Sequence, residues 1–225
     1  MPKRQRPAET TRSEHWLRNA VRDRTWELDA SVARAFGWSA DERIEWLSPI
    51  EDDGFAEYYD QAFLDRLGLT TLRVPLREFW PPGGPRWDGL ARTNSGKIIL
   101  VEAKAHIEEM VDFESKASSE SLELIRRSLD QVKSACGAAA AAPWYSPFYQ
   151  YANRLAHLYY LADLNQVDAY LLFVCFANAP DVPAPVTVEQ WEGARRLAWK
   201  CLGLGTKPFR GRVATLVMSV PDTSA

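Results

Sequence analysis

The chain contains little cysteine, little histidine and no long apolar run. Its 225 residues include three cysteines and three histidines. Cys136, Cys175 and Cys201 are odd in number and widely spaced, which argues against a disulfide framework and a zinc site and favours reduced thiols. A glycine-rich phosphate loop and a Ser–His or Cys–His nucleophile arrangement are also missing. Nucleotide hydrolysis by a P-loop and acyl transfer are therefore not expected.

Membrane and secretory signals are missing as well. No apolar stretch approaches the roughly 20 residues needed to span a bilayer, so we expect no membrane partner. Residues 1–12 are polar and basic and lack the apolar core of a signal peptide, and we expect a disordered tail there. With reduced thiols, this predicts a cytoplasmic protein. The net charge of −3 argues against a basic coat for nucleic acid, although a basic groove can exist on an acidic surface.

What the chain does contain is a pair of charged residues at the end of an apolar strand. The β-branched run Ile98-Ile99-Leu100-Val101 follows the turn signal Asn94-Ser95-Gly96 and predicts a buried strand. Side chains alternate across a strand, so Glu102 and Lys104 point to one side and Ala103 to the other. Burying charged side chains beside such a strand costs free energy, so we expect these two residues to have a function.

A third charged residue lies on the strand expected to pair with this one. Residues 86–91 predict a partner strand, and a hairpin centred near Ser95 sets Asp88 opposite Glu102. Directly opposed residues have Cβ atoms roughly 4.5–5.5 Å apart. Two carboxylates at that separation repel each other unless a cation lies between them, so the pattern predicts a metal site.

The pattern Pro85-x-x-Asp88 … Glu102-x-Lys104 resembles the PD-(D/E)XK nuclease superfamily, which has the restriction-endonuclease-like fold. The resemblance covers about residues 50–180, and the proline stands three residues before the aspartate instead of next to it. It implies a metal-dependent nuclease acting on DNA more than RNA. Asp88, Glu102 and the backbone carbonyl of Ala103 would hold Mg²⁺ or Mn²⁺, both hard cations that prefer oxygen ligands. Lys104 would orient the attacking water and offset charge on the phosphate.

Two alternatives to this hypothesis stay open. The charged residues could form a surface salt bridge at an exposed strand end. The chain could also be a catalytically silent module of the same fold that binds nucleic acid or a protein partner. The sequence leaves the oligomeric state open, a homodimer included.

Further site residues are expected on two helices. The resemblance implies a glutamate on the helix before the first strand, and Glu57, on the helix predicted over 55–67, is our candidate catalytic residue and metal ligand. Gln150, Asn153 and Arg154 share one face of the helix predicted from Pro147. Gln150 resembles the glutamine of the superfamily, while Arg154 stands where a tyrosine is usual. We expect Arg154 and Asn153 to contact nucleic acid. For both helices, a solvated polar face is the alternative.

The order of elements predicts an α/β fold with a mixed central sheet flanked by helices. Beyond the tail we expect one domain, with an N-terminal helical extension at 13–50 and a nuclease-like part at 51–225, whose core order the resemblance gives as α-β-β-β-α-β. The expected helices lie over 13–36, from Ser39 to before Pro49, over 55–67, around 122–132, from Pro147 and over 187–202. The expected strands lie at 72–76, 86–91, from Ile98, at 168–176 and at 212–220.

Overall fold

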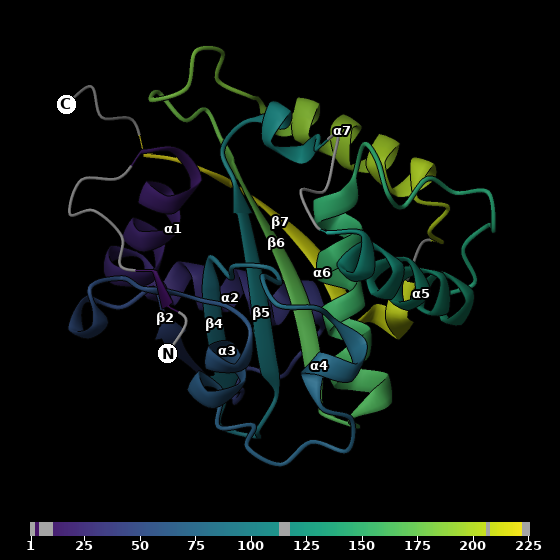
Figure 1. The fold of residues 1–225 in the computed structure, drawn as a ribbon. Coiled ribbons are helices and arrows are strands. Elements are labelled where there is room, and N and C mark those ends of the chain that lie inside the picture. Colours follow the sequence, from purple (N-terminus) through teal and green to yellow (C-terminus); the bar gives the residue numbers. More distant parts are fainter. Residues whose placement is uncertain (1–2, 5–10, 113–117, 206–207, 222–225) are drawn as a thin grey trace.

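The computed structural model describes residues 3–4, 11–112, 118–205 and 208–221 (Figure 1). Its strands are β1 Lys3–Arg4, β2 Ile44–Ser48, β3 Glu57–Tyr58, β4 Gly89–Thr93, β5 Ile98–Lys104, β6 Ala169–Ala177 and β7 Val213–Ser219. Its α-helices are α1 Arg12–Asp23, α2 Thr25–Phe36, α3 Gln61–Arg66, α4 Leu76–Phe79, α5 Ser119–Ala135, α6 Tyr149–Tyr159 and α7 Val188–Cys201. A π-helical turn, Tyr160–Leu164, continues α6.

The central sheet is mixed and has the strand order β2-β4-β5-β6-β7. β2, β4 and β5 are antiparallel neighbours, while β6 pairs parallel with both β5 and β7. A parallel pair requires a long crossover connection, which α5 and α6 supply between β5 and β6 and α7 supplies between β6 and β7. The expected α/β class with a mixed, helix-flanked sheet is confirmed.

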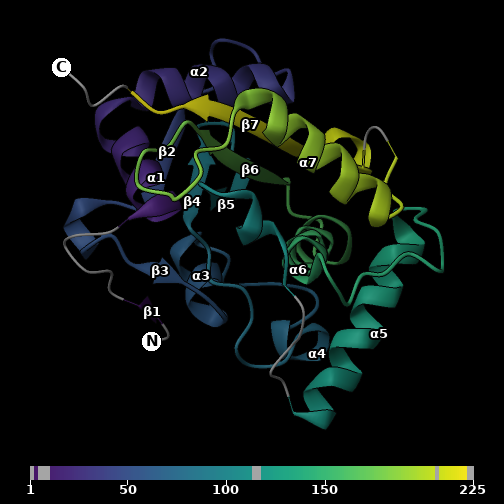
Figure 2. The same ribbon diagram turned by 90° about the horizontal axis from the view of Figure 1, so that it is seen from above.

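Helices cover both faces of the sheet (Figure 2). α1 and α2 pack on one face, where Leu17 and Leu28 belong to the same buried cluster as Val101 and Ala103 of β5. α3, α4, α6 and α7 pack on the other face, and α5 lies outside α6. Every residue of β5 is buried. The side chains of Glu102 and Lys104 therefore lie inside the protein. The alternative of a surface salt bridge at an exposed strand end is wrong.

The predicted register of the β4–β5 hairpin is confirmed. Gly89 pairs with Val101 and Leu90 with Leu100, and the next pair in this series is Asp88 with Glu102. The turn contains Gly96 at φ 89°, a conformation that residues with a Cβ rarely adopt. The turn signal read from the sequence thus fixes which residues face each other across the hairpin.

Two predicted elements before the hairpin are wrong. Residues 39–48 form a turn and strand β2 instead of a short helix. Glu42, in the predicted helix, instead accepts hydrogen bonds from Ser95 Oγ and Lys97 Nζ in the hairpin turn, and β2 pairs with β4. The predicted strand at 72–76 is a loop that leads into α4. The backbone N–H of Val74 donates to the Asn165 side chain, and its carbonyl accepts a hydrogen bond from the Tyr160 hydroxyl, so neither group is available to a neighbouring strand.

The helix predicted over 55–67 is wrong in its first half. Asp53 does not cap a helix there; its carboxylate accepts hydrogen bonds from Ala56 N and Tyr58 Oη. These contacts hold the chain extended, and Glu57 and Tyr58 form β3, with α3 beginning at Gln61. Glu57 therefore lies on a strand and not on a helix.

The remaining elements agree closely with the sequence. α2 ends at Gly37, which has the left-handed conformation expected of a C-terminal stop. α5, α7, β6 and β7 lie where periodicity predicts them, whereas α6 begins at Tyr149, two residues after the expected Pro147.

Most of the predicted tail, 1–2 and 5–10, lies outside the described residues, and Lys3–Arg4 pairs with β3. None of the described helices is long and apolar enough to cross a membrane.

Candidate functional site

The charged end of β5 and the first turns of α6 form a hydrogen-bonded cluster. Lys104 Nζ donates to Glu102 Oε1 at 2.6 Å and to Gln150 Oε1 at 3.0 Å. Glu102 is 2% exposed and Lys104 is 7% exposed. Three residues predicted as site residues from separate parts of the sequence are therefore in direct contact. Gln150 holds the Lys104 ammonium on the side away from β4.

Asp88 lies directly before β4, beside the same end of β5. Its Oδ2 accepts a hydrogen bond from Ala103 N at 2.8 Å. The N–H and C=O of one residue in a strand point toward the same neighbouring strand. The carbonyl of Ala103 therefore points toward the side on which Asp88 lies, as the predicted ligand set requires.

Glu57 lies on β3, an element that the sequence did not indicate. β3 belongs to a separate two-stranded sheet with β1, and an isolated antiparallel bridge between Tyr58 and Trp87 joins it to the segment before β4. The next pair in this register is Glu57 with Asp88, and opposed residues lie on the same face. Glu57 is 5% exposed. Continued by one residue, the Tyr58–Trp87 and β4–β5 registers set Glu57, Asp88 and Glu102 in one row. That Glu57 belongs to the site stays a prediction.

Arg154 donates a hydrogen bond to the second carboxylate oxygen of Glu102. Its Nε donates to Glu102 Oε2 at 2.6 Å, and its Nη2 donates to the carbonyl of Arg86 at 3.1 Å. Its guanidinium also lies over the Trp87 ring, 5.2 Å from the centroid. The spacing of α6 predicted that Arg154 shares a face with Gln150. It did not indicate that this face packs against the sheet and pairs with Glu102.

The mutual attraction of these charges outweighs the cost of burying them. Burial alone would raise the pKa of the Glu102 carboxyl, but the charges of Arg154 and Lys104 and their hydrogen bonds hold that pKa below its ordinary value. Burial alone would lower the pKa of Lys104, but Glu102 and Asp88 raise it. Glu102 and Lys104 are therefore both ionised near neutral pH.

The polar face of α6 continues behind the cluster and is buried. Asn153 and His157 are both shielded from solvent, so neither lies on an open surface that could contact a long nucleic acid. His157 Nδ1 lies 3.0 Å from the carbonyl of Asn153, and its ring packs between Trp80 and Trp87. Within the described part of the chain, Asn153 Oδ1, His157 Nε2 and Trp87 Nε1 have no hydrogen-bond partner.

The donor types at this site fit a hard divalent cation, but their present arrangement is incomplete. Carboxylates and a backbone carbonyl are the ligands that Mg²⁺ prefers. Among the described residues, no group of three or more acidic, histidine or cysteine side chains lies close enough to hold a metal ion. Both oxygens of Glu102 already accept from cations. A metal bound here by Asp88 and Glu102 would compete with Arg154.

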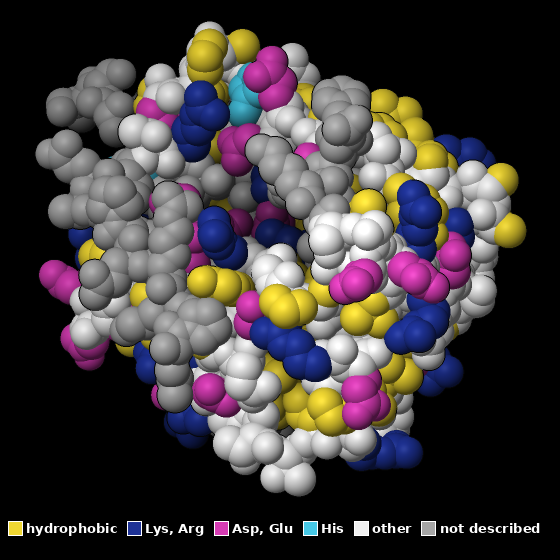
Figure 3. Space-filling model, viewed as in Figure 1, with side chains coloured by type: hydrophobic (Ala, Val, Ile, Leu, Met, Phe, Trp, Pro, Cys, Tyr) yellow, Lys and Arg dark blue, Asp and Glu magenta, His cyan; other side chains and the backbone are white. Residues whose placement is uncertain are grey.

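The surface on this side of the molecule mixes both signs of charge. Figure 3 shows acidic and basic side chains close together in a hollow near the middle of the face. Comparisons of the chain with protein-family models, with curated proteins and with solved structures give no significant match. Its function must therefore be argued from the geometry of the site itself.

Proposed function

We propose that this protein is a metal-dependent nuclease that hydrolyses phosphodiester bonds, in DNA more than in RNA. The observation that supports it most is the buried contact of Glu102 with Lys104, beside the hydrogen bond from Ala103 N to Asp88 Oδ2. The mixed sheet, in which β2, β4 and β5 are antiparallel neighbours and β6 is parallel to β5, also supports the proposal.

In this proposal, Asp88, Glu102 and the Ala103 carbonyl hold Mg²⁺ or Mn²⁺, with Glu57 as a further ligand. The bound ion supplies an activated water and neutralises charge on the phosphate. Lys104, fixed by Gln150 and Glu102, presents an ammonium that orients the water and stabilises the developing charge. Because Lys104 is ionised, it acts as a hydrogen-bond donor in the resting state.

Arg154 has two roles in this proposal. Without metal, it neutralises Glu102 and allows the carboxylate to be buried. A metal held by Glu102 would displace the guanidinium, whose planar fork would then be free for a substrate phosphate. Asn153, the neighbouring residue in α6, is as buried as Arg154.

The contact between Arg154 and Glu102 also favours a second candidate function. If the guanidinium permanently takes the place of a metal, the protein is a silent module of this fold that binds nucleic acid or a protein partner. The two candidates differ in one measurable property, because only the first requires that the wild-type protein bind Mn²⁺.

The experiment is incubation of the full chain with plasmid, linear and single-stranded DNA and with RNA, in Mg²⁺, Mn²⁺ or excess EDTA. We expect cleavage with either metal and none in EDTA. Binding of Mn²⁺ is measured separately by calorimetry. Absence of both Mn²⁺ binding and cleavage would favour the silent module.

Two variants separate metal binding from chemistry. Lys104→Ala leaves the proposed ligands in place, so we expect Mn²⁺ binding to persist and kcat to fall roughly 10²–10³-fold, as for loss of one oxyanion donor. Asp88→Ala removes a ligand, so both properties should be lost. The matched controls are Lys200→Ala and Asp41→Ala, which change exposed residues of the same types. Undiminished hydrolysis by Lys104→Ala, or cleavage that persists in EDTA, would refute the mechanism.

A further inference from the structure

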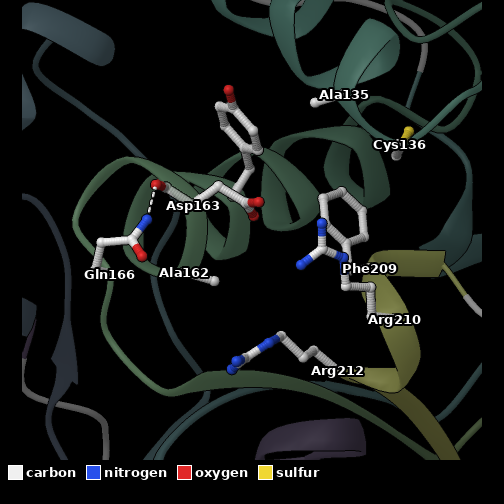
Figure 4. A pocket seen from close by; sticks show the side chains of 9 residues that line it. Ala135, Cys136, Ala162, Asp163, Gln166, Phe209, Arg210 and Arg212 are labelled. Atoms are coloured by element: carbon white, nitrogen blue, oxygen red, sulfur yellow. Dashed lines mark hydrogen bonds between the residues drawn. The ribbon is translucent and has the colours of Figure 1, made fainter.

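A second cavity lies at the opposite end of α6 from the candidate site. It measures about 340 Å³ and is enclosed by the end of α5, the π-helical turn after α6 and the segment before β7 (Figure 4). Volumes of roughly 300–1,000 Å³ are typical of small-molecule sites. Lys104 pairs with Cys175 at the far end of β6, six residues from Ala169, which is about 20 Å at the usual rise of a strand. The cavity is therefore separate from the candidate site.

One wall of this cavity carries an arginine that is held rigidly in place. Arg212 Nη1 donates to Asp168 Oδ1 at 2.6 Å and to the carbonyl of Ala169 at 3.1 Å. Its guanidinium lies over the Tyr170 ring, 5.2 Å from the centroid. Within the described residues these contacts use only Nη1, so Nε and Nη2 are available as donors. A fixed guanidinium with free N–H groups is suited to recognise an oxyanion.

A second arginine lines the same cavity. Arg210 is exposed and forms no ion pair or hydrogen bond with any residue that the structure describes. Figure 4 shows the Arg210 guanidinium, the Phe209 ring and the Asp163 carboxylate gathered on one side of the cavity, while Arg212 crosses the other. Asp163 is the acidic residue of this lining and Asp168 pairs with Arg212, so Arg210 supplies the positive charge that no ion pair among the described residues neutralises.

The backbone that carries these side chains is strained. Gln166, Phe209 and Arg210 have φ values of 58°, 52° and 57°, in the left-handed region that residues with a Cβ rarely adopt. Such conformations cost free energy and tend to gather at ligand sites, where the surrounding structure maintains them. Here they turn an aromatic ring, an amide and a guanidinium toward one cavity.

We propose that this cavity binds a small phosphomonoester that carries a planar ring, with a nucleoside 5′-monophosphate as the ligand class that fits best. The phosphate lies between Arg210 and Arg212, the base packs on the Phe209 ring, and Asp163 and Gln166 bond to ribose hydroxyls or the base edge. This site is independent of the proposed nuclease function, because neither arginine belongs to the Asp88–Glu102 cluster.

The test is calorimetric titration of the full chain with adenosine 5′-monophosphate in EDTA, so that no nuclease activity or metal is involved. Adenosine and inorganic phosphate are titrated in parallel. We expect the monophosphate to bind more tightly than either fragment. Arg210→Gln should weaken that binding roughly tenfold to a hundredfold, the effect of losing one charged hydrogen bond. Phe209→Leu should weaken binding of the monophosphate but not that of inorganic phosphate.

The control is Arg196→Gln, which removes an exposed arginine from α7 and should leave binding unchanged. Thermal melting of each variant checks that it is folded. Absence of monophosphate binding, equal affinity for adenosine, or equal affinity of wild-type and folded Arg210→Gln protein would each overturn the proposal. Binding of a 5′-phosphorylated DNA strand through Arg210 without binding of the monophosphate would also overturn it, in favour of a strand-end site.

Discussion

His157 should make the stability of this protein unusually sensitive to mild acid. Its ring is fully buried, with Phe63, Trp80 and Trp87 around it. Burial lowers the pKa of His157 to about 3, and the Asn153 carbonyl, the charge of Arg154 and the charge of Asp60 alter it by smaller amounts. The imidazole therefore stays neutral in the folded protein, and Nδ1 carries the proton that it donates to the Asn153 carbonyl.

The sign and size of the effect follow from the difference between the folded and unfolded states. An unfolded histidine has a pKa of about 6.5. Because the folded pKa is lower, the unfolded chain binds the proton first, and acid shifts the equilibrium toward unfolding. The stabilisation from His157 is complete above about pH 6.5 and decreases steadily as the pH falls toward about 3. Between about pH 7.5 and about pH 5.5, the free energy of unfolding should fall by about 1.4 kcal/mol from this residue alone.

Urea unfolding followed by tryptophan fluorescence measures this difference. The comparison is His157→Phe, which keeps a ring of similar size and removes the titration. The wild type should lose about 1.4 kcal/mol more than the variant between the two pH values. The carboxylates of the chain are present in both proteins, so their contribution cancels. If the two proteins lose stability equally, His157 is not the neutral, buried base described above.

Two further predictions concern stability and packing. Glu102→Gln leaves two buried cations without their anion, and it should lower the free energy of unfolding by about 3–5 kcal/mol in urea titrations; a loss below about 1 kcal/mol would show that the cluster is solvated. Gly89→Ala should destabilise by about 1–3 kcal/mol, because the added Cβ would lie 3.1 Å from Val101 Cβ and 3.2 Å from the carbonyl of Ser48. The control Gly193→Ala, in α7 with no atom within 4 Å of the new Cβ, should instead raise the melting temperature.

The core of the candidate site could be predicted because it depends on local rules. Alternation along β5 puts Glu102 and Lys104 on one face, and the turn around Ser95 sets Asp88 opposite Glu102. Both rules operate within a hairpin, where side-chain direction and turn length decide the pairing. The place of Gln150 at the site was expected from the resemblance to the superfamily, whereas periodicity gave only the residues that share its face of α6.

The parts that could not be predicted depend on tertiary contacts. β3 is two residues long, and its pairing with Trp87 decides where Glu57 lies. No period can be detected in so short a strand, and the acidic residues around it suggest a helix start equally well. In the same way, spacing shows that Arg154 and Gln150 share a face of α6, but it does not show which surface that face meets.

The candidate site contains one contact between residues that are close in the sequence and one between residues that are far apart. Asp88 and Ala103 are 15 residues apart, whereas Glu102 and Arg154 are 52 apart. Closing the longer loop costs about 1 kcal/mol more in chain entropy, and it requires that α5 and α6 be formed and docked. The β4–β5 hairpin, which carries Asp88 and Glu102, can therefore form early in folding, whereas the contact of Arg154 with Glu102 forms late. Substitutions in α5 or α6 should thus slow the burial of Glu102 even when they lie far from it.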